Sequence, residues 1–161
     1  MKKTVVVLGL LAMTISSFAQ IEITHSKDEM TNEVSYFASE RFIVANSELT
    51  KGCAIDMVID EKAGILTSKH IFVEMVGLES CNENNTLIFL LNGDRRITLK
   101  SWNKFNCKGA AYFTLTKTDI DLLKSNQVLK VRIENGKSYK NYTSEVKYKK
   151  YFIEFYNALN N

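Results

Sequence analysis

Residues 86–100 read TLIFLLNGDRRITLK, and this stretch decides the fold because two β-type runs flank a turn signal. The run 86–91 is apolar, and the run 95–100 alternates apolar with polar residues. Asn92-Gly93-Asp94 between them favours a tight connection. The pattern predicts an antiparallel hairpin, and if Leu91 lies opposite Arg96 the numbers of facing residues sum to 91 plus 96, or 187.

The hairpin bears on the three cysteines of the chain, which cannot all pair with one another. Cys81 and Cys107 sum to 188, so they lie almost opposite each other across the open end of the hairpin. In an oxidising compartment we expect these two to form a disulfide and one thiol to remain. The remaining thiol is Cys53, which we expect to be a small buried apolar side chain.

Further β-type runs lie on both sides of the hairpin. They are 33–38, 41–46, 53–59, 70–76, 109–116 and 128–134. Alternation in two of them predicts which residues face the core. These are Cys53, Ile55, Met57 and Ile59 in one run, Leu129, Val131 and Ile133 in the other.

Helix signals come late in the chain. Thr116 or Thr118 is a candidate N-cap for a short helix over 119–124. Tyr148, Phe152, Phe155 and Leu159 recur at helical spacing, which predicts a C-terminal helix beginning near Ser144. The chain is therefore expected to be mainly β, an antiparallel β-sandwich or open barrel with one short helix and a C-terminal helix.

The first residues have the features of a secretory signal peptide. Lys2 and Lys3 precede an apolar stretch over 5–13, and small residues at Ser17 and Ala19 fit signal peptidase. We expect residues 1–19 to be removed and residues 20–161 to form a single domain, periplasmic or secreted, with no membrane span in the mature chain.

The charge of the chain is divided between its halves. Residues 20–94 contain 5 Lys/Arg and 13 Asp/Glu, a net charge of −8. Residues 95–150 contain 14 Lys/Arg and 4 Asp/Glu, a net charge of +10. Either the halves neutralise each other in the fold, or the second half offers a basic surface to an acidic partner.

The sequence contains no motif that favours an enzyme. His25 and His70 lack Cys or His neighbours at metal-site spacing, and no phosphate loop or nucleophile elbow is present. We expect no metal and no cofactor. The alternatives are an envelope enzyme that uses Cys53, with His70, or a carboxylate pair such as Asp60-Glu61 or Asp28-Glu29, and an inhibitor that presents the hairpin end to a hydrolase.

A binding or interaction module is the preferred interpretation. Aromatic and basic side chains mix near the open end of the hairpin, where stacking and charge suit a glycan or polyanion of the cell envelope, or a protein, rather than a nucleic acid. The predicted contact surface consists of Arg95, Arg96, Lys100, Trp102 and Lys104.

From Cys81 onward the sequence resembles that of a group of small exported proteins of Gram-negative, gut-type bacteria with no assigned function. The resemblance rests on the hairpin, Phe105-Asn106-Cys107-Lys108-Gly109, Val131-Arg132-Ile133 and the aromatic C-terminal segment. It implies an exported fold in which the two cysteines beside the hairpin are paired. More remotely, the stretch 28–38 with the closing helix is similar to invasion-associated locus B and secretion-accessory β-sandwiches.

Overall fold

A computed structural model describes residues 21–48, 50–76, 85–102, 109–134 and 141–160. The predicted signal peptide, Cys81, Cys107 and Lys104 lie outside these ranges. The strands are β1 (Ile23–Lys27), β2 (Glu33–Ala38), β3 (Phe42–Ala45), β4 (Gly52–Lys62), β5 (Ile65–Val76), β6 (Thr86–Leu91), β7 (Arg96–Lys100), β8 (Ala110–Thr114), β9 (Val128–Glu134) and β10 (Asn141–Glu145). The α-helices are α1 (Lys117–Ser125) and α2 (Tyr151–Leu159), and a single 3₁₀ turn η1 spans Asn92–Asp94.

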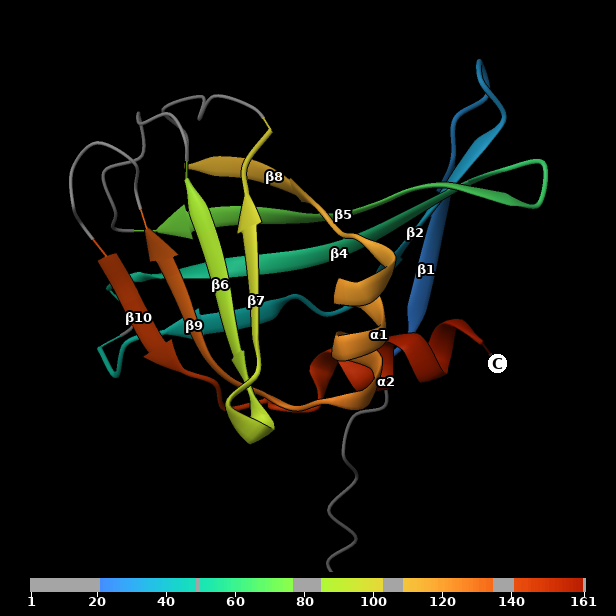
Figure 1. The fold of residues 1–161 in the computed structure, drawn as a ribbon. Helices are drawn as coiled ribbons and strands as arrows, with labels where there is room; N and C mark the ends of the chain where they lie inside the picture. Colours follow the sequence, from blue (N-terminus) through green and yellow to red (C-terminus); the bar gives the residue numbers. More distant parts are fainter. Residues whose placement is uncertain (1–20, 49, 77–84, 103–108, 135–140, 161) are drawn as a thin grey trace, which may run out of the picture.

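The strands form two antiparallel sheets that enclose a common core (Figure 1). The six-stranded sheet has the order β1-β2-β4-β5-β8, with β3 also paired to β4, and the four-stranded sheet has the order β10-β9-β6-β7. An isolated bridge between Ser101 and Phe113 joins the end of β7 to β8, so the two sheets meet at one corner. The predicted mainly β architecture, a sandwich or open barrel with a C-terminal helix, is confirmed.

The hairpin over 86–100 is confirmed, but its register differs by one residue from the prediction. Leu90 pairs with Arg96, so facing residues sum to 186 rather than 187. The backbone N–H of Leu91 donates to the carbonyl of Arg95 at 2.8 Å, which leaves three residues in the connection. Gly93 and Asp94 both have positive φ there, so the connection reverses the chain within three residues.

A second hairpin, β4–β5, is longer than the sequence patterns indicated. The pairing runs from Gly52 with Val76 to Lys62 with Ile65, and Ala63-Gly64 make the two-residue turn. Both turn residues have positive φ, at 53° and 78°, the conformation that matches the twist of a two-residue hairpin. This hairpin places Asp60, near the end of β4, opposite Ser68, near the start of β5.

Two predicted details near the C-terminus are wrong. Residues 141–145 form strand β10 paired with β9, and the helix begins at Tyr151 rather than near Ser144. On β9, Val131 and Ile133 are buried as expected, whereas Leu129 is only half-buried and Val128 is buried. The pairing of β9 with β6 shifts register between Leu90 and Leu91, so that Val128 and not Leu129 faces the core at the start of β9.

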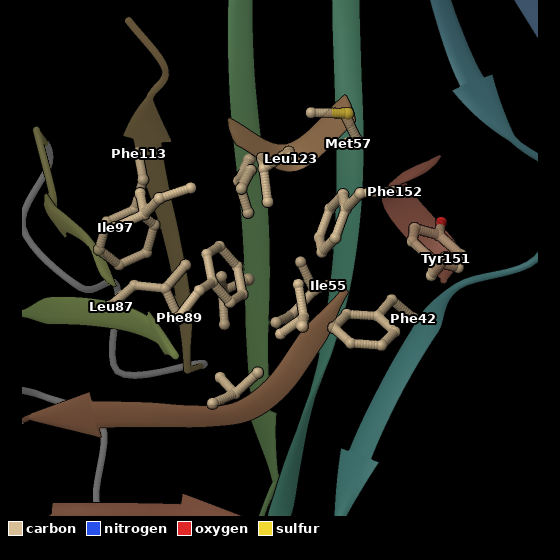
Figure 2. Packing of buried hydrophobic residues seen from close by; sticks show 14 of the residues in the cluster. Phe42, Ile55, Met57, Leu87, Phe89, Ile97, Phe113, Leu123, Tyr151 and Phe152 are labelled. Atoms are coloured by element: carbon tan, nitrogen blue, oxygen red, sulfur yellow. The ribbon is translucent and has the colours of Figure 1, made fainter. Parts of the chain in front are cut away.

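The core lies between the two sheets and is closed by α2. The predicted core face of β4 is confirmed, since Cys53, Ile55, Met57 and Ile59 are at most 3% exposed. Phe152 of α2 meets Phe42 of β3 and Phe89 of β6 edge-to-face, with ring centroids 5.2 and 5.4 Å apart (Figure 2). One aromatic side chain of the terminal helix therefore contacts both sheets.

Helix α1 has the N-terminus that its sequence predicts. The Thr116 hydroxyl accepts from the backbone N–H of Asp119 at 3.2 Å, and the Asp119 carboxylate accepts from the Thr116 N–H at 2.9 Å. This reciprocal capping box satisfies backbone donors that the first turn leaves unpaired. Lys124 at the other end lies over the Tyr156 ring of α2, 4.9 Å from its centroid, so the two helices support each other.

Candidate functional site

The outer face of the six-stranded sheet, the side turned away from the core, carries the candidate site. Strand register groups its side chains into rows that cross the sheet. The rows are Asp60–Ser68, Val58–His70–Thr114, Asp56–Phe72–Tyr112 and Ala54–Glu74–Ala110. Most of these side chains are half-buried, so the face is an apolar and polar mixture accessible from outside.

Four rings on this face, His70, Phe72, Trp102 and Tyr112, form a connected set that we call the ring cluster. Tyr112 is central, with centroids 4.9 Å from Phe72, 5.6 Å from His70 and 5.2 Å from Trp102. Trp102 also approaches His70 edge-on at 6.4 Å, and its backbone N–H donates to the Tyr112 carbonyl at 3.2 Å. Trp102 nevertheless remains 62% exposed, so a rigidly placed indole faces outward.

Beside the ring cluster lies a polar cluster of Ser35, Asp60, Ser68 and His70. The Ser35 hydroxyl donates to Asp60 Oδ1 at 2.7 Å, and the Ser68 hydroxyl donates to Asp60 Oδ2. His70 Nδ1 lies 3.2 Å from Ser68 Oγ and 3.5 Å from Asp60 Oδ2. The carboxylate therefore organises side chains from three strands, β2, β4 and β5.

Burial of the imidazole favours the neutral form of His70. Burial lowers the pKa of His70 below 6.5, and the nearby Asp60 charge only partly opposes this effect. Because the Ser68 hydroxyl donates its proton to Asp60, its oxygen is free to accept from His70, and the neutral imidazole then carries its proton on Nδ1. The Nε2 atom is then the acceptor of the neutral ring.

This arrangement differs from a nucleophilic triad. A triad places the carboxylate on one imidazole nitrogen and the hydroxyl on the other, so that the base removes the hydroxyl proton. Here Ser68 and Asp60 both lie at Nδ1, and the hydroxyl proton points to the carboxylate. The geometry suits the holding of a ligand rather than activation of Ser68.

Two hollows adjoin the ring cluster on the outer face. The larger has a volume of about 610 Å³, extends from the β4–β5 turn to α1, and includes Asp60, Leu66, His70, Trp102 and Ile120 among its lining residues. The smaller, of about 340 Å³, lies over Phe37, Asp56 and Phe72. His70 lines both hollows, so they adjoin at this side chain.

An ion-pair group borders the smaller hollow. The guanidinium of Arg41 donates to both oxygens of Asp56 through Nε and Nη2 at 2.8 to 3.1 Å, and to Glu74 through Nη1 at 2.8 Å. The hydrogen bonds that Arg41 donates to the Asp56 carboxylate are the main reason that the pKa of Arg41 is raised. These contacts neutralise part of the negative charge of the face.

The residues of the predicted contact surface are distributed over different parts of the molecule. Arg96 and Lys100 lie on the outer face of the four-stranded sheet, and Arg95 donates to Asn126 Oδ1 at 3.3 Å. Trp102 instead packs on the six-stranded sheet, because the Ser101 bridge carries the chain around the corner. Lys104, Cys81 and Cys107, the last two predicted to pair, lie outside the described residues. The hairpin end of the inhibitor alternative is described only as far as Trp102.

Cys53 is in the wrong environment for a nucleophile. It is 3% exposed, and burial raises the pKa of its thiol to about 12. It pairs with Met75 on the core side of the sheet, whereas His70 lies on the outer face. A Cys53–His70 pair is therefore excluded by the strand register.

The carboxylate alternatives also have structural roles. Asp28 accepts from the backbone N–H groups of Met30 and Thr31, and these bonds lower its pKa. Asp60 is bound by two serines. Within the described ranges, no group of three or more metal-ligating side chains is brought together.

Sequence reasoning missed the roles of Ser68, Tyr112 and Asp60 in this site. The Ala63-Gly64 turn predicts the hairpin, but extending the ladder from it would place Thr67 opposite Asp60. Ser68 lies there because of the register shift between Asp60 and Glu61, which no local pattern displays. Tyr112 becomes relevant only through the pairing of β8 with β5, which involves residues far apart in the chain.

Comparison of the chain with protein-family models, curated proteins and solved structures found no match. The resemblance to exported Gram-negative proteins stays an expectation from the sequence. In the part of the chain that the structure describes, no helix is long and apolar enough to cross a membrane.

Proposed function

We propose that the protein is an exported, non-catalytic binding module of the cell envelope that holds a neutral glycan on the outer face of the six-stranded sheet. The observation that carries this proposal is Trp102, the single tryptophan, which is 62% exposed yet held by two other rings beside a hydrogen-bonded carboxylate. Exposed, pre-positioned aromatic groups with convergent polar neighbours are typical of binding sites.

The chemistry of the face matches that of a sugar. A pyranose has one face of C–H groups, which packs on the electron-rich face of an indole, and a rim of hydroxyls. The hydroxyls of Ser35 and Ser68, the Asp60 carboxylate and the neutral His70 ring offer hydrogen-bond partners at the edge of the larger hollow. The adjoining smaller hollow extends the surface beyond one sugar unit, which favours an oligosaccharide.

The outer-face carboxylates of β4 support binding rather than hydrolysis. Asp56 and Asp60 are four residues apart on one strand, so their backbones are about 13 Å apart. Glycosidase pairs hold their carboxyl groups about 5 to 9.5 Å apart, which is less than this backbone separation. In addition, Arg41 holds Asp56 and two serines hold Asp60, so each carboxylate already has hydrogen-bond partners.

The binding proposal is tested with a panel of neutral oligosaccharides and three variants. Trp102→Ala removes the stacking surface and Asp60→Asn alters the polar cluster, while Ile43→Ala removes an exposed apolar side chain from the same face outside both hollows. We expect Trp102→Ala to weaken binding about tenfold or more and Ile43→Ala to leave it unchanged. Absence of binding across the panel, or equal affinity in Trp102→Ala, would contradict the proposal.

The export proposal has its own test. Intact mass and N-terminal sequencing of protein from the native host should give a chain that begins at Gln20. Recovery of protein that retains Met1 or Lys2 from the cytoplasm would overturn export and leave the binding test unaffected.

A further inference from the structure

The outer face of the four-stranded sheet, which we call the basic face, differs sharply from the ring-cluster side. Its side chains line up in rows across β7, β6 and β9 because the strand registers coincide. The rows are Arg96–Leu90–Lys130, Thr98–Ile88–Arg132 and Lys100–Thr86–Glu134. Cations therefore occupy β7 and β9, and Leu90 and Ile88 of β6 lie between them, while β10 extends the sheet beyond β9.

The cations of the basic face are exposed. Arg96, Lys100, Lys130 and Arg132 all reach the surface. Glu134 is the acidic residue of these rows on β9, and β10 adds Glu145 at the register position next to Lys130. The Oε1 of Glu134 lies 3.6 Å from Arg132 Nη1, and about half of the arginine side chain remains exposed. Counting the four cations with Glu134 and Glu145, the formal net charge of the rows is 4 minus 2, or +2.

The positions of the charges follow from sheet geometry. Arg96 and Lys130 flank Leu90, so their backbones are two strand spacings, about 10 Å, apart. Lys100 lies four residues along β7 from Arg96, about 13 Å away. The charges are too widely spread for one small anion and suit acid groups that repeat along a chain.

The middle of the basic face is hollowed. Ile88 and Leu90 are half-buried and form the floor of a depression of about 230 Å³ whose other lining residues are Arg96, Thr98, Lys130 and Arg132. An apolar floor with a cationic rim accommodates a ring that has a C–H face and anionic substituents. A sugar ring carrying a carboxylate or a sulfate has this form.

We propose that the basic face binds an anionic polysaccharide, with its acid groups on the cations of β7 and β9 and a sugar ring over Ile88 and Leu90. Guanidinium groups bind such oxyanions with two parallel hydrogen bonds, which favours Arg96 and Arg132 as the principal contacts. The site is separate from the ring cluster and does not depend on the function proposed for it.

Other polyanions fit the basic face less well. Single-stranded nucleic acid requires aromatic platforms, and the rows of this face contain no ring. A membrane surface favours apolar side chains that project beyond the cations, whereas Ile88 and Leu90 lie at the bottom of the depression. Charge complementarity together with the recessed floor therefore favours the polysaccharide.

The test measures the affinity of the protein for polygalacturonate, dextran sulfate and neutral dextran. The double variant Arg96→Gln/Arg132→Gln removes two charges from the basic face. Lys27→Gln/Lys62→Gln removes two exposed charges at the ends of β1 and β4, on the far side of the molecule from β6, β7, β9 and β10 (Figure 1). Circular dichroism and thermal melting establish that both variants fold.

We expect wild-type protein to bind one or both acidic polymers and to ignore dextran, with affinity that falls as salt rises. Arg96→Gln/Arg132→Gln should bind about tenfold more weakly, and the lysine control should bind as wild type. Preference between the two polymers assigns the acid group as carboxylate or sulfate.

Three results overturn the proposal. They are equal binding of dextran, unchanged affinity in the arginine double variant, and binding only of DNA or of anionic phospholipid vesicles in parallel assays. Trp102→Ala should retain wild-type affinity for the acidic polymer, so failure at this site and failure at the ring cluster are distinguishable.

Discussion

Replacing Phe152 by alanine tests whether α2 closes the core between the two sheets. The side chain is 1% exposed, and its ring meets Phe42 of one sheet and Phe89 of the other edge-to-face. Truncation of a buried phenylalanine costs about 3 to 5 kcal/mol. Because Phe152 contacts both sheets and the cavity would lie between them, we expect a loss near the top of this range, about 4 kcal/mol or more.

For a domain of this size, such a loss corresponds to a fall in Tm of about 15 °C. Urea denaturation followed by circular dichroism gives the free energy of unfolding, and calorimetry gives Tm. Two controls accompany the variant. Phe152→Leu should cost about 1.5 kcal/mol or less, and Asn157→Ala, at an exposed position of the same helix, should stay within about 0.5 kcal/mol of wild type. A loss below about 1 kcal/mol in Phe152→Ala would refute the role of α2.

Three further perturbations probe the cysteines, the polar cluster and the cap of α1. In a thiol titration of the oxidised protein, Cys53 should be unreactive while the protein is folded, because burial raises its pKa to about 12. The titration should find one thiol after denaturation and three after reduction. Three thiols before reduction would contradict the Cys81–Cys107 bridge. Asp60→Asn should lower the pKa of His70 further, as followed by NMR of its ring, because the carboxylate charge opposes the effect of burial. Below about pH 6.5 His70 is protonated in the unfolded chain before it is protonated in the folded protein, so the unfolded chain binds more protons. The free energy of unfolding should therefore decrease as pH falls from about 6.5 toward the folded pKa, and the decrease should be larger in Asp60→Asn. An unchanged His70 titration in the variant would contradict the contact between His70 and Asp60. Thr116→Ala should cost about 1 kcal/mol in urea denaturation, and no loss would argue against the capping box.

Local patterns predicted most of the elements of this fold. The alternation of Cys53, Ile55, Met57 and Ile59 identified the core face of β4, because side chains on a strand alternate whatever the partner. The carboxylates after Thr116 marked the start of α1. These features depend on neighbours within a few residues, which the sequence displays directly.

Other features depend on contacts that local patterns do not display. Residues 141–145 pair with β9, and this pairing overrides the aromatic spacing that favoured an earlier helix start. The register of the β6–β7 hairpin shifted by one residue because the connection has positive φ at both Gly93 and Asp94. Tertiary pairing decided the first case, and the backbone conformation of the connection decided the second.

The candidate site was only partly accessible from the sequence. Trp102 was predicted as a contact residue, and the structure places it on the outer surface. Its neighbours were missed, because the Ser101–Phe113 bridge turns it away from Arg96 and toward Tyr112 and His70. The basic residues instead join Lys130 and Arg132, which β9 brings beside β6.

The central claim is that Trp102 forms part of the glycan-binding surface, and its own fluorescence tests that claim most directly. Trp102 is the single tryptophan of the chain, so the emission reports this position alone. Titration with the oligosaccharide selected by the panel should shift the emission to shorter wavelength and protect the indole from iodide quenching, with saturation at the affinity measured independently. Saturating ligand that leaves both the emission and the quenching unchanged would show that the ligand binds elsewhere.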